Sequence, residues 1–353
     1  MNPFDAIVVI TDFSAVANNA VRRAALLARE HDARLSILHV IDRKGDDRAG
    51  DRVARTIDPT LRATQARASL ERIADELSRA FDVKADLVLQ FGDSLDVLVS
   101  ESSRASLVVL GQRAGGSIKE LVFRTRIDRL LDACARPVLV VKQEAKGRYR
   151  RVLTALDFTP ASDAAALIAA ALAPSAALHL MHVFRPESDD ALRRTEVRAD
   201  LLRKMGARQD AGVIAQMRRR AATMGFDSRK LRFEVGRGSS ASTILSQRRT
   251  QEADLVAVGR QQRSKWLDAL LGSVSRRVLA RSQGDVLVVP SLPGSSVVSR
   301  AAAARRLPSG RDDRAAFAPP GWTIEADPAN TRPPAWPPAQ SARPDNPLGT
   351  SPP

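Results

Sequence analysis

Short apolar runs alternate along this chain with longer segments whose apolar residues recur every three or four positions. The first run, Phe4–Ile10, is continuous and rich in β-branched residues, which predicts a buried strand. The next segment places alanine, valine and leucine at helical spacing from Ala17 to Ala28, which predicts an amphipathic helix. Asp12 or Ser14 is expected to cap this helix, because a side-chain oxygen can accept from its free first-turn N–H groups.

The same alternation continues to about residue 290. Further strands are predicted at Arg34–Val40, Lys84–Gln90, Leu107–Leu110 and Val138–Val141, and further helices at Pro59–Phe81, Leu95–Arg104, Ile118–Ala133 and, in the second half, Ser188–Met224. Short buried strands that alternate with amphipathic helices require crossover connections. The pattern therefore predicts an α/β fold built on doubly wound parallel sheets.

The two halves of the chain repeat each other. Four landmarks recur in the same order: Ile7–Ser14 as Val152–Thr159, Leu35–Val40 as Leu178–Val183, Leu107–Gly111 as Leu255–Gly259, and Val138–Val141 as Val286–Val289. The offsets between equivalent residues are 145, 143, 148 and 148 positions. Because the order is kept at a nearly constant offset, we expect two tandem five-stranded domains, at residues 1–145 and 146–290.

The strand and helix pattern stops after residue 290. Thirteen of the 20 prolines lie from Ser291 onward, and proline lacks a donor N–H and disfavours helix in the residue before it. We therefore expect residues 291–353 to form a disordered tail. Within it, Trp322 and Trp336 belong either to short binding motifs or to a spacer without partners.

The formal net charge of +15 raises the question of a nucleic-acid or anionic-membrane partner. Basic residues gather in the long helical region of the second half: Arg193, Arg194, Arg198, Arg203, Lys204, Arg208, Arg218, Arg219 and Arg220. No aromatic side chains are interleaved with them to stack on bases. This pattern favours a solvated helix face, and a nucleic-acid surface stays open as the alternative.

The cysteine count and the apolar runs narrow the class of protein. The single cysteine, Cys134, rules out an internal disulfide framework and a Cys-based zinc site, and we expect it to be a buried small hydrophobe rather than a redox sensor. The first residues lack a basic n-region, and the longest apolar run, Ala164–Ala173, is too short to cross a bilayer. We expect a soluble, cytoplasmic protein with no membrane association.

The residue patterns of familiar catalytic sites are missing from the sequence. It contains neither a Gly-x-x-x-x-Gly-Lys-Ser/Thr phosphate loop nor a Gly-x-Ser-x-Gly nucleophile turn. His39 and His182 are repeat equivalents at strand ends, and no Cys, Asp or Glu at ligand spacing accompanies them. We therefore expect structural or surface histidines, no metal site and no enzyme.

In a doubly wound sheet, ligands bind at the carboxyl ends of strands where the strand order reverses. That places Asp12 and Gly111, with their copies Asp157 and Gly259, at candidate sites. An opening strand that ends in Asp-Phe-Ser, a second in His-Val, a fourth in Gly and a last strand Pro-Val-Leu-Val-Val together resemble the universal stress protein domain. The resemblance covers about residues 3–142 and 150–290, and it implies an adenine-nucleotide alpha-hydrolase-like fold.

Many members of that family bind ATP through Gly-x-x-Gly, nine residues, and then Gly-Ser or Gly-Thr, where a glycine lets the backbone approach phosphate. The first half keeps Gly111 but has Ala114 at the second glycine and Arg124-Thr125 at the late pair. The second half has Gln262 at the second glycine but keeps the first and the late pair. The resemblance thus implies nucleotide contacts at Asp157, Val183, Gly259, Gly272, Ser273 and Val274, and weaker ones at Asp12, Val40 and Gly111.

Structural roles compete with these assignments. The aspartates can cap helices, Gly259 can serve a tight turn, and Gly272-Ser273 can be a loop and helix cap. The resemblance implies a cytoplasmic stress-response protein that binds ATP weakly, in the second domain, with at most slow incidental hydrolysis. The apolar edge strands of the two halves are expected to pair, which would make the chain a pseudo-dimer able to assemble further. A ligand-free interaction scaffold and a nucleic-acid-associated protein stay open.

Overall fold

The structure, a computed structural model, describes residues 2–42, 58–112, 127–184, 199–260, 273–291 and 296–306. The first half contains β1 (Ala6–Ile10), α1 (Ala15–His31), β2 (Arg34–Asp42), α2 (Pro59–Phe81), β3 (Ala85–Gly92), α3 (Ser94–Ser102), β4 (Leu107–Gly111) and β5 (Val138–Val141). Residues 127–133, before β5, are also helical.

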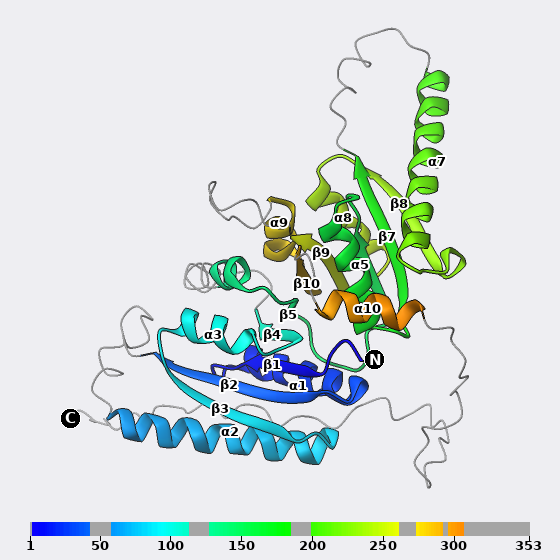
Figure 1. Cartoon of the computed structure of the whole chain (residues 1–353). Coiled ribbons are helices and arrows are strands. Elements are labelled where there is room, and N and C mark those ends of the chain that lie inside the picture. Colours follow the sequence, from blue (N-terminus) through cyan, green and yellow to red (C-terminus); the bar gives the residue numbers. More distant parts are fainter. Residues whose placement is uncertain are drawn as a thin grey trace, which may run out of the picture. The chain divides into compact units, whose positions relative to one another are not determined.

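The second half repeats this order of elements. It contains β6 (Arg151–Ala155), α5 (Pro160–Leu172), β7 (Ala177–Phe184), α7 (Ala199–Thr223), the short helix η1 (Ser228–Lys230), β8 (Leu231–Arg237), α8 (Ser240–Thr250), β9 (Leu255–Arg260), α9 (Ser273–Arg281), β10 (Asp285–Pro290) and α10 (Ser296–Arg306). Figure 1 shows strands flanked by helices in both halves, the first in blue to cyan and the second in green to orange.

Each half forms a parallel five-stranded sheet. The strand order is β3-β2-β1-β4-β5 in the first half and β8-β7-β6-β9-β10 in the second. All neighbours within each half run parallel. The order reverses between β1 and β4, and again between β6 and β9, so each half has a switch point at those strand ends. The predicted doubly wound α/β fold is confirmed.

Local sequence signals set the ends of the helices. Helix α2 occupies its predicted range because Asp58 accepts from the Thr60 N–H at its start, and Asp82 ends it in a left-handed conformation with φ of 54°. The predicted helices Ile118–Ala133 and Ser188–Met224 are helical in their described parts, from residues 127 and 199 onward. Their earlier residues lie outside the described ranges.

Apolar side chains on the two sides of the sheet form two core clusters. One cluster holds residues of α1, α2, α5, α7 and α10 together with one alternating set of strand residues. The other holds residues of the 127–133 helix, α8 and α9 together with the opposite set. Because strand side chains alternate between faces, continuous apolar strands fill both clusters at once.

The last strands of the two halves pair with each other. Strands β5 and β10 run antiparallel, with Val140 opposite Val286, Leu139 opposite Leu287 and Val138 opposite Val288. All six side chains are buried. The two sheets thereby join into one sheet of ten strands, which is the pairing expected from the apolar edges.

A buried carboxylate lies beside this pairing. Asp285 begins β10 and is 0% exposed. Its Oδ1 accepts from the main-chain N–H groups of Lys142 and Gln143 at 2.8 and 3.1 Å, and its Oδ2 accepts from the Tyr149 hydroxyl at 2.5 Å. Burial raises the pKa of Asp285, and these donors and Arg23 oppose that rise.

Arg23 completes the charge balance from the other half of the chain. Its Nε lies 3.6 Å from Asp285 Oδ2, and its guanidinium lies 4.2 Å from the centre of the Tyr149 ring. Pro137 holds the repeat position equivalent to Asp285. The carboxylate of this cluster therefore has no counterpart at the start of β5. The cluster joins α1, the segment between the domains and β10.

The predicted tail is wrong over residues 296–306, which form helix α10. Val297 and Ala301 are fully buried against the core beside α5, and Arg300 donates to Asp5 at 2.7 Å. Between Pro293 and Pro308 the chain has no proline and carries four consecutive alanines, which favour helix. The prediction missed this helix because it was made from the average composition of residues 291–353, which is rich in proline. Residues 307–353, with both tryptophans of the tail, lie outside the described ranges.

Two glycines allow helices to approach strand ends closely. A Cβ at Gly111 would lie 2.5 Å from the carbonyl oxygen of Val16, in the first turn of α1. A Cβ at Gly259 would lie 2.4 Å from the carbonyl carbon of Ala161, in the first turn of α5. Both glycines are therefore required by helix packing, a role different from the tight turn expected for Gly259.

We predict that Asp285→Asn lowers the free energy of unfolding by about 3–5 kcal/mol, because it leaves the Arg23 charge buried without a carboxylate. Asp86→Asn, at an exposed position of the edge strand β3, is the matched control. Urea denaturation followed by circular dichroism measures both. Equal midpoints for the two variants would show that the buried pair contributes nothing.

We predict that Gly111→Ala and Gly259→Ala each destabilise the protein by about 1–3 kcal/mol, because the new methyl group meets backbone that cannot move aside. Gly212→Ala is the control: it lies in α7 with no atom within 4 Å of the added methyl group, and alanine favours helix. Thermal unfolding without nucleotide measures all three variants. If Gly111→Ala and Gly259→Ala leave the stability unchanged, helix packing does not require glycine at these positions.

Candidate functional site

The turns after β1 and β6 are built alike. Asp12 Oδ1 accepts from the Ser14 N–H at 3.0 Å. Asp157 Oδ1 accepts from the Thr159 N–H at 3.1 Å and from its hydroxyl at 2.5 Å. Each bond spans two residues, so the aspartates brace the turns between strand and helix.

The residues that cap the following helices come two positions later. The Ser14 side chain accepts from the Ala17 N–H at 3.2 Å, and the Thr159 side chain accepts from the Ser162 N–H at 3.3 Å. Of the two caps expected for the first helix, the structure therefore has Ser14. The role of helix cap proposed for Asp12 and Asp157 is wrong, and both side chains are exposed.

A phenylalanine and a histidine pack together at each turn. Phe13 and Phe158 adopt φ of 63° and 64°, a left-handed conformation that is costly for a bulky residue. Their rings lie 4.3 and 4.8 Å from the rings of His39 and His182. Each histidine Nδ1 lies 2.8 or 2.7 Å from the carbonyl two residues before the phenylalanine, so Nδ1 carries the proton. The expected structural role of these histidines is thereby explained.

The candidate residues of each half lie on neighbouring strand ends. Asp157 follows β6, Val183 lies near the end of β7 and Gly259 near the end of β9. These three strands are adjacent in the order β7-β6-β9. Asp12, Val40 and Gly111 occupy the matching places on β1, β2 and β4. Both valines are half-buried and contact the core, as expected.

In the second domain a hydrogen bond joins the end of β9 to the first turn of α9. The Ser275 hydroxyl donates to the Gly259 carbonyl at 3.0 Å, and α9 begins at Ser273. Val274, in the same turn, contacts the core. The structure thus places the first turn of α9, which begins with Ser273 and Val274, beside the end of β9 through Ser275, whereas Gly272 lies outside the described residues.

The first domain cannot form the same bond. Ile127 holds the repeat position of Ser275, is 4% exposed and has no hydroxyl. The two candidate sites therefore share their strand ends but differ where the helix after the fourth strand begins.

Sequence reasoning missed Arg260, the residue after Gly259. Its side chain is 4% exposed, donates to the Cys134 carbonyl at 3.1 Å and lies 3.5 Å from Asp132 Oδ1. Burial lowers the pKa of Arg260, and the Asp132 carboxylate opposes that shift. The available signal was the difference from Gln112 at the equivalent position of the first half.

Cys134 is buried, as the sequence predicted. Its thiol is free, and burial raises its pKa, which disfavours the reactive thiolate. The surroundings of this thiol are therefore those of a core residue.

The basic helix has partners within its own domain. Arg220 forms an ion pair with Asp163, and the Arg218 guanidinium lies 5.7 Å from the centre of the Phe233 ring. For these two residues the contacts favour the structural role over a nucleic-acid surface. Arg193, Arg194 and Arg198 of the cluster lie outside the described residues.

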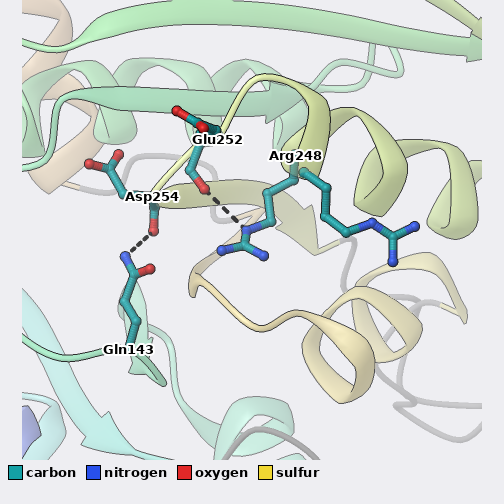
Figure 2. A pocket seen from close by; sticks show the side chains of 6 residues that line it. Gln143, Arg248, Glu252 and Asp254 are labelled. Carbon is teal, nitrogen blue, oxygen red and sulfur yellow. Dashed lines mark hydrogen bonds between the residues drawn. The ribbon is translucent and has the colours of Figure 1, made fainter.

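An open hollow lies at the opposite, amino end of β9. It is lined by Gln143, Arg248, Arg249, Glu252, Ala253 and Asp254 (Figure 2). Gln143 Nε2 donates to the Asp254 carbonyl at 2.7 Å, and Arg248 Nε donates to the Ala253 carbonyl at 3.1 Å. The Asp254 carboxylate accepts from two main-chain N–H groups at the start of β6, both at 2.9 Å. The bonds from Gln143 and from the start of β6 to Asp254 hold the segment between the domains against the amino end of β9. The polar groups around the hollow therefore have a structural role.

Two features are absent from the residues that the structure describes. No helix in them is long and apolar enough to span a membrane. The same ranges contain no group of three or more His, Cys, Asp or Glu side chains arranged to hold a metal ion.

Solved structures share the architecture of both halves. A universal stress protein from Archaeoglobus fulgidus DSM 4304 superposes with a TM-score of 0.60 at 20% identity, covering 81% of this chain and 98% of that one. A functionally unknown protein from Pseudomonas aeruginosa PAO1 superposes with a TM-score of 0.55 at 19% identity, covering 86% and 97%. At these identities the likeness shows the fold alone.

Sequence comparison agrees with the structural likeness. A protein of Mycolicibacterium smegmatis described as a universal stress protein is 28% identical over 295 residues, covering 80% of this chain and 96% of that protein. The profile of the universal stress protein family matches residues 3–142 and again residues 148–290. The chain therefore belongs to the universal stress protein family, with two of its domains in tandem.

Proposed function

We propose that this chain is a cytoplasmic stress-response protein whose second domain binds an adenine nucleotide at the carboxyl ends of β6, β7 and β9. The observation that carries the proposal is the bond from the Ser275 hydroxyl to the Gly259 carbonyl. It holds the start of α9 beside the strand end where the motif of the ATP-binding family members begins.

The residues at this place suit a phosphate. The N-terminal N–H groups of a helix attract anions, and α9 begins at Ser273 next to the Gly272 position of the motif. The hydroxyl of Ser273, the serine of the motif, would add a hydrogen-bond donor to the phosphate. Asp157 and Val183, on the neighbouring strand ends, would flank the nucleoside.

The first domain is proposed to have lost this site. Ile127 replaces the serine that joins strand and helix, and Arg124-Thr125 replaces the glycine-serine pair. An arginine side chain where backbone must approach phosphate adds bulk at the closest point of contact. The first domain would then serve as the structural partner of the second.

The proposed action is binding without turnover. Asp157 is the carboxylate among the second-domain candidates, and its Oδ1 accepts from both the N–H and the hydroxyl of Thr159. A carboxylate engaged in this way braces the turn and is poorly placed to activate water.

We predict that Gly272→Arg abolishes ATP binding and that Ser275→Ala weakens it by about three- to tenfold, the worth of one hydrogen bond. Ser242→Ala, at an exposed position of α8, is the matched control and should bind as the wild type does. Titration calorimetry with ATP on the full chain measures the four proteins.

The same titration decides between the function classes. Binding by the wild type that survives Gly272→Arg would place the nucleotide elsewhere. No heat of binding and no nucleotide released from the purified wild type would overturn the proposal in favour of a ligand-free interaction protein.

A further inference from the structure

The first domain contacts the second-domain site from both sides of the β9–α9 connection. On one side is Arg260, which follows Gly259 and reaches the end of the 127–133 helix through Asp132 and the Cys134 carbonyl, at 3.5 and 3.1 Å. The Arg260 side chain is buried in this contact, so the end of β9 is fixed to the first domain.

On the other side is Arg276, in the first turn of α9. Its Nε lies 4.0 Å from Asp128 Oδ2, at the beginning of the same 127–133 helix, and both side chains are about one-third exposed. Arg276 directly follows Ser275, the residue that bonds to Gly259. One short helix of the first domain therefore contacts both the end of β9 and the first turn of α9, the two described elements that flank the proposed phosphate site.

In both ion pairs the arginine belongs to the second domain and the aspartate to the first. Arg276 and Asp128 are repeat equivalents at an offset of 148 residues, so two identical copies would present like charges to each other at this place. The tandem chain instead places arginine in the second domain and aspartate in the first. Gln112, the equivalent of Arg260, is buried, and its Oε1 has no hydrogen-bond partner among the described residues.

We propose that the 127–133 helix of the first domain is the positioning element of the second-domain nucleotide site, with Asp128 and Asp132 acting through Arg276 and Arg260. The inference rests on the proposed function, and it adds that the contact between the domains controls the affinity for the nucleotide. Ion pairs that hold the end of β9 and the start of α9 in place reduce the conformational freedom that ATP binding would otherwise have to remove.

Reciprocity gives the proposal a regulatory consequence. If the interdomain ion pairs strengthen nucleotide binding, then nucleotide binding strengthens the contact between the domains by the same factor. Anything that separates the 127–133 helix from β9 and α9 would therefore weaken nucleotide binding by that factor.

A charge exchange on the full chain tests this. Asp128→Arg places two guanidinium groups next to each other, and Arg276→Asp places two carboxylates next to each other. The double variant restores an ion pair in which the two charges have changed places. Glu252→Gln breaks an exposed ion pair with Arg151 at the amino end of β6 and is the matched control. The two readouts are ATP affinity by calorimetry and amide hydrogen exchange of α9 in the nucleotide-free protein.

We expect each single variant to weaken ATP binding by about fivefold or more and to speed amide exchange in α9. The double variant should recover most of the lost affinity, and Glu252→Gln should change neither readout. Asp132→Asn should weaken binding, and Asp132→Glu should retain it, if position 132 acts through Arg260.

The outcomes separate the two proposals. Faster exchange in α9 without ATP binding by any variant or by the wild type would overturn the proposed function, and with it the positioning role. Wild-type binding that all single variants retain, or a double variant no better than the singles, would overturn the positioning role alone.

Discussion

The antiparallel pairing of β5 with β10 is the constraint on which the arrangement of the two domains depends. Parallel sheets end in unpaired edges, and the valine-rich last strand of each repeat would expose such an edge alone. Their pairing buries both strands and brings Asp285 against Arg23 of the first half and Tyr149 of the segment between the domains. A buried carboxylate with these partners permits one arrangement and penalises any that separates them.

Fusion of two copies into one chain removes the requirement that both interface surfaces be identical. Asp285 stands where the first copy has Pro137, and Arg276 faces its own equivalent, Asp128. The pairing of Arg276 with Asp128 is not available to a symmetric pair of identical domains, which would place like charges there. In this chain the first domain supplies the carboxylates, Asp132 and Asp128, that pair with Arg260 and Arg276 of the second.

The sequence was sufficient for the elements, the repeat and the strand pairing, because continuous apolar strands and capped amphipathic helices depend on local pattern. It was insufficient wherever a side chain acts across the fold. Arg260 counted only toward net charge, and Gly259 was weighed as a nucleotide contact or a turn residue, whereas the structure shows that it makes room for α5. Helix α10 was hidden by the prolines on either side of it. The assignment of Gly272 to phosphate binding stays a prediction.

We propose that duplication preserved two folds and one ligand site. Equilibrium dialysis of the full chain against labelled ATP, carried to saturation, counts the sites directly. We expect one ATP bound per chain at saturation. Two ATP per chain would contradict it, because the first domain would then bind without the serine that joins strand to helix in the second, and none would contradict it as well.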